Sequence, residues 1–169
     1  MIKLGYIGLG GRGRNMLKTV LDSFTNVEIV GLCDINEERL EQCKQITEEK
    51  TGKTPFCTTC EDDIFNLDID CVMIMTYWET HIPLAIKAMK KGIRPGIEVG
   101  GAYSLNACFD LVKTYEETGV PVMMLENCCY GKRELTVLKM VKEGLSAEEI
   151  VEKINDLVAK VDASFVIDN

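Results

Sequence analysis

Three glycines near the start of the chain, Gly8, Gly10 and Gly13, follow the pattern G-x-G-x-x-G directly after the apolar run IKLGYI. Gly11 and Arg12 fill the variable positions, and the helical pattern RNMLKTVLDSF comes next. In such a loop the first glycine permits a tight turn, the second lets the backbone approach a pyrophosphate, and the third lets the helix pack on the strand. Free N–H groups at the helix N-terminus favour the anion. The spacing predicts a loop that cradles the phosphates of a nucleotide.

An acidic residue is expected about 20 residues after such a loop, and Asp34 stands there, at the end of VEIVGLC. A carboxylate at this place accepts hydrogen bonds from the adenosine ribose hydroxyls and repels a 2′-phosphate, so it predicts NAD rather than NADP. Arg39 in the following helix could soften that preference, but we expect it to be a solvated helix residue. The alternative is a glycine turn beside a surface carboxylate, and the coincidence of strand, loop, helix and acid argues against it.

Strand-like apolar segments alternate with amphipathic helical segments along residues 1–125. The predicted strands cover 2–7, 27–33, 54–56, 70–76, 96–99 and 120–125. The predicted helices cover 14–24, 36–50, 81–92 and 104–119, with Pro83 in the first turn of the third and an apolar stripe on the fourth. Alternation of this kind is typical of βαβ units. The sequence predicts an α/β fold, a doubly wound parallel-sheet Rossmann fold in a single domain with a helical C-terminal extension.

Composition narrows the class of partner and the compartment. The 169 residues carry a formal net charge of −8 at pH 7. That charge argues against a nucleic-acid partner and against an anionic membrane surface. No apolar run approaches the ~20 residues of a membrane span, and the N-terminus lacks the pattern of a signal peptide. We therefore expect a cytoplasmic protein.

Eight cysteines, mostly within apolar segments, are typical of small buried side chains in a reducing compartment. Only CTTC at 57–60 has the spacing of a metal or redox site. A zinc site needs about four ligands, and the remainder would have to come from His81 or from the vicinal pair Cys128 and Cys129. We therefore predict no metal site.

Five ordered segments, KLGYIGLGGRGRNM, VGLCDINEERL, YWETHIPLAIKAMKKG, IEVGGAYS and MMLENCCYGKRELTVLKMVKEGL, resemble the glucose–fructose oxidoreductase/inositol dehydrogenase family. They are most similar to the branch that contains sugar dehydrogenases and NAD-dependent α-N-acetylgalactosaminidases. The resemblance covers residues 2–145 and implies an N-terminal Rossmann domain that binds NAD(H), followed by a substrate domain. It implies that Trp78 and His81 lie at the cofactor edge and that Glu98 lies near the nicotinamide ribose. It places Asn127 and Tyr130 close to the nicotinamide end.

Two departures from the family pattern are visible. Many members carry a lysine directly after the glutamate that ends the fifth strand, whereas this chain reads Glu98-Val99-Gly100. In addition, residues 126–169 form a linker helix and a helical tail where the family's second domain is expected. Ser146 and Glu149 make a capping-box pattern at the start of the tail. We interpret the chain as truncated, and a replacement cap, a frameshifted end and a cut boundary all stay open.

Two functions stay open on the residues. The first is hydride transfer between a nicotinamide and a sugar-like carbon, with His81, Glu98 and Tyr130 as candidate acid–base residues. The second is a stand-alone nucleotide-binding module without catalysis. We favour the NAD-dependent oxidoreductase, and we expect the chain to be inactive alone because the substrate would be held by the second domain.

Two apolar stripes predict self-association. The first, on the segment 131–145, comprises Leu135, Leu138, Val141 and Leu145. The second, on the tail, comprises Ile150, Ile154, Leu157, Val158 and Val161. An uncovered patch of several hundred square ångströms is unusual on a soluble monomer. Either the tail folds over the first stripe or a second copy covers it, and we predict a homodimer whose interface includes residues 131–161.

Overall fold

The computed structural model describes residues 1–165, except for the side chains of residues 129, 157, 158 and 160–165. The chain divides into two compact units, Met1–Leu125 and Glu126–Asn169. The three residues of the tail stripe at 157, 158 and 161 therefore have side chains that lie outside the described part.

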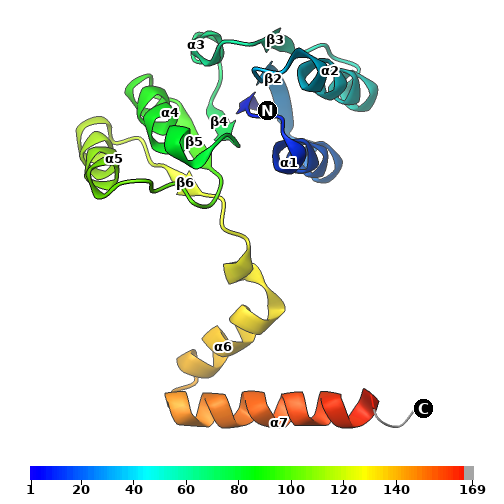
Figure 1. Ribbon diagram of the computed structural model, residues 1–169, viewed down its shortest axis with the longest axis vertical. Coiled ribbons are helices and arrows are strands. Elements are labelled where there is room, and N and C mark those ends of the chain that lie inside the picture. Colours follow the sequence, from blue (N-terminus) through cyan, green and yellow to red (C-terminus); the bar gives the residue numbers. More distant parts are fainter. Residues whose placement is uncertain (166–169) are drawn as a thin grey trace. The chain divides into compact units, whose positions relative to one another are not determined.

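The first unit is built on a six-stranded sheet in the order β3-β2-β1-β4-β5-β6 (Figure 1). All of its strand pairs are parallel. The strands are β1 (Ile2–Ile7), β2 (Val27–Cys33), β3 (Phe56–Thr58), β4 (Cys71–Ile74), β5 (Arg94–Ile97) and β6 (Met123–Met124). The order changes direction between β1 and β4, the point where sheets of this type bind their ligands. The predicted doubly wound Rossmann fold is confirmed.

Helices follow the strands along the first unit. They are α1 (Gly11–Ser23), α2 (Glu37–Thr51), α3 (Glu61–Ile64), α4 (Trp78–Lys90) and α5 (Leu105–Thr118). α1 packs against α2, and α4 packs against α5. None of the helices in the described range is both long and apolar enough to cross a bilayer.

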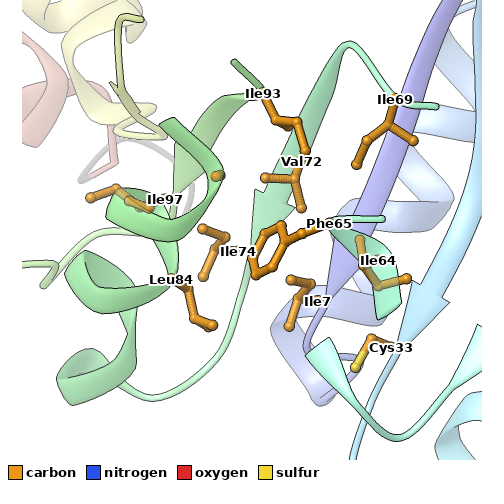
Figure 2. Close-up of a cluster of buried hydrophobic side chains, with 12 residues drawn as sticks. Ile7, Cys33, Ile64, Phe65, Ile69, Val72, Ile74, Leu84, Ile93 and Ile97 are labelled. Carbon is orange, nitrogen blue, oxygen red and sulfur yellow. The ribbon is translucent and has the colours of Figure 1, made fainter. Parts of the chain in front are cut away.

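Two clusters of buried apolar side chains hold these helices on the sheet. Alternating residues of β1 divide between them: Leu4 and Tyr6 belong to the cluster with α1 and α2, and Ile7 belongs to the other. Because neighbouring residues of a strand point to opposite faces, the clusters cover the two faces of the sheet. Figure 2 shows the second cluster, where Ile64 of α3 and Leu84 of α4 pack near the strands.

Some helix and strand boundaries differ from the sequence predictions, because glycines and prolines lie inside helices and strands. α1 begins at Gly11, three residues before the predicted start. α4 begins at Trp78 rather than at 81, so Pro83 lies in its second turn and not its first. β5 includes Pro95, although a proline is unfavourable inside a sheet because it lacks an N–H donor. The short helix α3 was not predicted.

The apolar stripe predicted on α5, which comprises Leu105, Cys108, Leu111, Val112 and Tyr115, forms its buried face only in part. Leu105, Val112 and Tyr115 are exposed, while Leu111 packs against the core and Thr114 is buried. The Thr114 hydroxyl donates a hydrogen bond to the Asp110 carbonyl at 2.7 Å. A threonine can enter the packed face because its hydroxyl is satisfied within the helix, which hydropathy alone does not indicate.

The second unit contains the short 3₁₀ helix η1 (Cys128–Tyr130), then α6 (Lys132–Lys142) and α7 (Ala147–Phe165). The predicted capping box is present, since Ser146 N–H donates to Glu149 Oε2 at 2.8 Å and Glu149 N–H donates to Ser146 Oγ at 3.3 Å. α6 contacts α7, and Ile150 is buried. The α6 residues Leu135, Leu138 and Val141 are about half exposed, which keeps one apolar face of α6 open to solvent.

We expect the exposed face of α6 to mediate dimer formation, because exposed apolar stripes favour association. Sedimentation equilibrium at micromolar concentration should give the mass of a dimer for the wild-type chain and that of a monomer for Leu138→Asp. The matched control is Lys139→Asp on the neighbouring surface, which should stay dimeric. A wild-type monomer at the same concentration would contradict the expectation.

Candidate NAD site

The turn between β1 and α1 requires glycine at two positions. Gly8 has a φ of +95°, which residues with a side chain rarely adopt. A Cβ at Gly8 would also lie 2.6 Å from the carbonyl oxygen of Met75, the residue after β4. A Cβ at Gly13 would collide with the Gly8 carbonyl oxygen. The turn is therefore packed backbone against backbone, and this contact brings the start of α1 onto the switch point of the sheet.

Gly10 and Gly11, in contrast, have open space in front of them. A Cβ at Gly10 would meet only Arg39 Nη1, at 4.0 Å, and a Cβ at Gly11 would meet nothing within 4 Å in the described part of the chain. Gly10 is the N-cap of α1 and has no side chain with which to satisfy the first N–H groups of the helix. Open backbone at the positive end of a helix fits a pyrophosphate.

Tyr6 fixes this turn from within the sheet. Its side chain is fully buried, and its hydroxyl donates a hydrogen bond to the Gly13 carbonyl at 2.9 Å. Burial raises the pKa of Tyr6 well above its usual value, so the hydroxyl remains a donor. Sequence reasoning missed this role. The available signal was a tyrosine in an aliphatic strand, since a buried tyrosine hydroxyl needs a partner.

Asp34 joins the glycine loop to the end of β2. The residue is only 7% exposed. Its Oδ2 accepts a hydrogen bond from Leu9 N–H at 2.6 Å, and its Oδ1 accepts one from Asn36 N–H at 2.8 Å. A carboxylate can accept about four hydrogen bonds, so Asp34 retains capacity for ribose hydroxyls beside the two that it accepts from the backbone.

A cavity of about 440 Å³ lies at the carboxyl ends of β1, β2 and β4. The phosphate loop and the acid share it, since Gly8, Gly10 and Asp34 are among its walls. The remaining walls come from the ends of β1, β2 and β4, from the β3–α3 connection and from α2, α3 and α4: Ile7, Cys33, Ile35, Arg39, Thr59, Glu61, Met75, Thr76, Tyr77, Thr80, Pro83, Leu84 and Lys87. The structure thus brings the two sequence signals for a dinucleotide together around one space.

Cys33 lines this cavity, and its thiol is unreactive. Burial, followed by the nearby carboxylates of Glu61 and Asp34, raises the pKa of the Cys33 thiol to about 12. A thiol with such a pKa stays protonated near neutral pH and is a poor nucleophile.

Arg39 is an exposed residue of α2, as the sequence interpretation expects, and it also lies beside the glycine loop. It lines the cavity, and its guanidinium reaches to 4.0 Å from the position of a Cβ on Gly10. Asn36 caps α2 by accepting a hydrogen bond from the Arg39 N–H at 3.0 Å, and this cap places Arg39 in the first turn beside the loop. Arg39 can therefore act on a phosphate bound in the cavity.

Arg12 and Glu98 form an ion pair between the glycine loop and the end of β5. Arg12 Nε lies 3.0 Å from Glu98 Oε2. Glu98 Oε1 accepts a hydrogen bond from Val99 N–H at 3.2 Å. The Glu98 side chain is 13% exposed and that of Arg12 is 52% exposed, so the pair is partly open to solvent. The ion pair connects the segment that follows β1 with the segment that follows β5.

Trp78 stands at the same edge of the sheet. It is the first residue of α4, and its indole lies directly against Gly100, where any Cβ would collide with the ring. Gly100 has a φ of +83°, so glycine is required there on two grounds. The side chain of Trp78 is nevertheless 61% exposed, which makes it available for stacking on a ligand.

His81 is fully buried, one turn into α4. Its Nε2 lies 3.0 Å from the Thr76 carbonyl oxygen, and its Nδ1 has no partner among the described residues. Thr76 lines the cavity, whereas His81 does not. The imidazole therefore holds the β4–α4 connection in place, which is a positioning role.

The other predicted residues lie outside the cavity. Asn127 and Tyr130 belong to the second unit, where Tyr130 ends η1 and is 67% exposed. Cys57 is half-buried on β3, and Cys60 is the exposed N-cap of α3. Among the described residues, no group of three or more histidine, cysteine or acidic side chains could hold a metal ion.

Comparison with known proteins agrees with this geometry. Residues 2–126 match a family described as oxidoreductases with an NAD-binding Rossmann fold. An alpha-N-acetylgalactosaminidase of Bacteroides fragilis is 40% identical over 156 residues, covering 88% of this chain and 36% of that protein. One of Tannerella forsythia is 37% identical over 156 residues, covering 89% and 33%. The chain spans about a third of the length of these relatives.

Solved structures share the fold. Myo-inositol 2-dehydrogenase from Lactobacillus plantarum superposes with a TM-score of 0.77 at 19% identity, covering 85% of this chain and 41% of that one. Scyllo-inositol dehydrogenase from Lactobacillus casei, with bound NAD(H) and scyllo-inositol, gives 0.78 at 16% identity, covering 85% and 42%. The predicted fold and the predicted cofactor, NAD, are confirmed.

Gly10→Val is expected to abolish NAD binding without unfolding the chain. The added side chain would occupy the open space before α1, and it meets no backbone there. Calorimetry should show no heat of binding, while thermal unfolding should change by less than about 1 kcal/mol. Gly13→Ala is the contrasting control, because its Cβ collides with the Gly8 carbonyl and should lower the stability itself. Normal NAD binding by Gly10→Val would place the phosphates elsewhere.

Asp34→Ser is expected to relax the preference for NAD over NADP by about tenfold, since the repulsion of a 2′-phosphate is lost while Arg39 remains to attract it. Fluorescence titration with NADH and NADPH measures both dissociation constants. Adding Arg39→Gln should weaken NADPH again and leave NADH little changed. A wild-type chain that binds both cofactors equally would contradict the role of Asp34.

Proposed function

Because the chain belongs to the Gfo/Idh/MocA oxidoreductase family and carries its NAD-binding Rossmann domain, we propose that it is the cofactor-binding part of a sugar-type oxidoreductase. The proposed reaction is hydride transfer between the nicotinamide of NAD and a hydroxyl-bearing carbon of a sugar or polyol. One observation carries the proposal: the open backbone at Gly10 and the buried carboxylate of Asp34 line the same cavity at the switch point.

The binding roles follow from the chemistry of each group. The N–H groups at the start of α1, opened by Gly10 and Gly11, bind the pyrophosphate. Asp34 accepts hydrogen bonds from the adenosine ribose hydroxyls through the capacity that its two backbone partners leave. Arg12 adds positive charge at the loop, on the side of Glu98. These interactions orient the dinucleotide across the carboxyl ends of the strands.

The nicotinamide half would then lie toward the end of β5, where Glu98 and Trp78 stand. NAD supplies the hydride acceptor, and the chain's part is to hold and orient it. Glu98 is fixed by Arg12 and by Val99 N–H, so it presents a constant negative edge to the nicotinamide ribose. The indole of Trp78 offers an exposed aromatic face at the same edge.

The substrate class is proposed from the relatives and not from a pocket in this chain. Two of the relatives are alpha-N-acetylgalactosaminidases, and the scyllo-inositol dehydrogenase structure holds bound NAD(H) and scyllo-inositol. N-acetylgalactosamine and scyllo-inositol both carry secondary hydroxyl groups on a ring. A sugar or polyol is therefore the substrate class proposed for the whole enzyme.

The candidate acid–base residues of the first unit are already engaged by the protein itself. His81 is buried against the Thr76 carbonyl, and Glu98 is paired with Arg12. A general base must lie within hydrogen-bond reach of the reacting hydroxyl. Neither side chain is presented to a substrate within the first unit, and we therefore propose that the chain binds NAD but does not turn over a sugar alone.

We expect calorimetry to show one NAD bound per chain, while assays with a panel of sugars and polyols show no formation of NADH. The same preparation of Gly10→Val provides the blank for nonspecific heat. Formation of NADH with any member of the panel would contradict the proposed inactivity. Absence of NAD binding by the wild-type chain would contradict the proposed function as a whole.

A further inference from the structure

With the pyrophosphate at Gly10 and the adenosine ribose at Asp34, one end of the cavity still has no part of the dinucleotide assigned to it. It lies beyond Asp34 and is formed by Ile35, by Thr59 and Glu61 after β3, and by Lys87 on α4. Ile35 is 81% exposed although it is large and apolar. Glu61 is the one carboxylate besides Asp34 among the residues that line this cavity. An exposed isoleucine beside one carboxylate fits a flat base that carries a hydrogen-bond donor.

We propose that the carboxylate of Glu61 accepts a hydrogen bond from the exocyclic amino group of adenine and thereby makes the chain select adenine over other purines. This inference rests on the proposed function, because it takes the dinucleotide to occupy the cavity with its adenosine ribose at Asp34.

Strand register places Glu61 where the base must lie. β2 and β3 are paired with Cys33 opposite Thr58, so the residues that follow each strand, Asp34 and Thr59, leave the sheet side by side. Glu61 comes two residues later, as the first residue of α3. A ribose held by Asp34 has the pyrophosphate at Gly10 on one side, toward β1. Its base therefore extends to the other side, toward the end of β3.

Electrostatics agree with this placement. The carboxylates of Glu61 and Asp34 both contribute, after burial, to the raised pKa of Cys33, which also lines the cavity. Both acidic side chains therefore act on the same part of the cavity.

Lys87 holds the Glu61 side chain without consuming its acceptor capacity. Lys87 Nζ lies 2.9 Å from Asp62 Oδ1 and 3.6 Å from Glu61 Oε1. The shorter contact is a hydrogen bond, whereas the longer one exceeds ordinary hydrogen-bond length and is the weaker of the two. Glu61 is thus oriented by a cation and can still accept a hydrogen bond from a ligand. Asp62 does not line the cavity.

The chemistry of the base edge gives the selectivity. A carboxylate accepts hydrogen bonds and donates none. Adenine presents an amino donor at its 6-position, whereas hypoxanthine and guanine present a carbonyl oxygen, which a carboxylate repels. The side chains of Ile35 and Pro83 provide apolar walls for the faces of the ring. Selectivity therefore depends on Glu61, and affinity for the ring also depends on the apolar walls.

The test compares NAD with nicotinamide hypoxanthine dinucleotide, which carries an oxo group in place of the 6-amino group of the base. Calorimetry on the full chain should show that the wild type binds NAD about tenfold more tightly, a difference of about 1.4 kcal/mol. Glu61→Gln should bring the two dissociation constants within about twofold, because an amide both donates and accepts. Asp62→Asn is the matched control, since it shares Lys87 but not the cavity, and it should keep the wild-type ratio.

The outcomes separate the two proposals. Equal binding of the two dinucleotides by the wild type overturns the role of Glu61 and leaves the proposed function standing. The role of Glu61 is also overturned if Glu61→Gln leaves the ratio of the two dissociation constants unchanged. It is likewise overturned if Asp62→Asn lowers that ratio as much as Glu61→Gln does. If the wild type binds neither dinucleotide, the proposed function fails, and this inference fails with it. Circular dichroism of each variant confirms that the fold is retained.

Discussion

The close packing of the β1–α1 turn on the start of the β4–α4 connection is the constraint on which the site depends. Gly8 and Gly13 leave no room for a side chain, so the backbone of the turn contacts Met75 and itself directly. The contact places the N-terminus of α1 at the carboxyl end of the sheet, beside the segments that follow β2 and β4. A side chain at either glycine would force these backbone segments apart and would shift the loop relative to Asp34 and the β4–α4 connection.

Two polar side chains, those of Tyr6 and Asp34, help to hold the β1–α1 turn in place, and each also has a second role. Tyr6 belongs to the α1–α2 core and also bonds the Gly13 carbonyl. Asp34 is buried, which would be costly for a lone carboxylate. Its two backbone N–H partners offset that cost and at the same time tie the loop to β2. Binding and folding are coupled in this region, because the groups that would contact the dinucleotide are those that hold the loop.

The sequence predicted those parts of the site that depend on backbone conformation or on the end of a strand. Gly8, Gly10, Gly13 and Asp34 were found from spacing. Gly8, Gly10 and Asp34 line the cavity, and Gly13 packs against the Gly8 carbonyl within the turn. Residues whose position depends on tertiary packing were not found: Tyr6, Glu61 and Lys87 carry no local signal beyond their type. Arg39 was correctly predicted to be an exposed helix residue, but helical periodicity does not show that the polar face of α2 begins beside the glycine loop. The α5 stripe was correct only in part, since a threonine bonded to its own helix can replace an apolar residue in the packed face.

The two halves of a bound dinucleotide would meet different surroundings. The cavity is lined by Gly10, Asp34 and Glu61, groups suited to phosphate, ribose and base, and so it would enclose the adenosine half. Arg12, Glu98 and Trp78, which are proposed for the nicotinamide half, are not among its walls, and Trp78 is largely exposed. Affinity gained on the enclosed half can be large while the reacting half stays open to water. Hydride transfer needs a reacting centre from which water is excluded and in which the substrate is oriented. We therefore expect the described residues of the first unit to recognise NAD, and we expect the chemistry to require a group that covers the edge formed by Glu98 and Trp78.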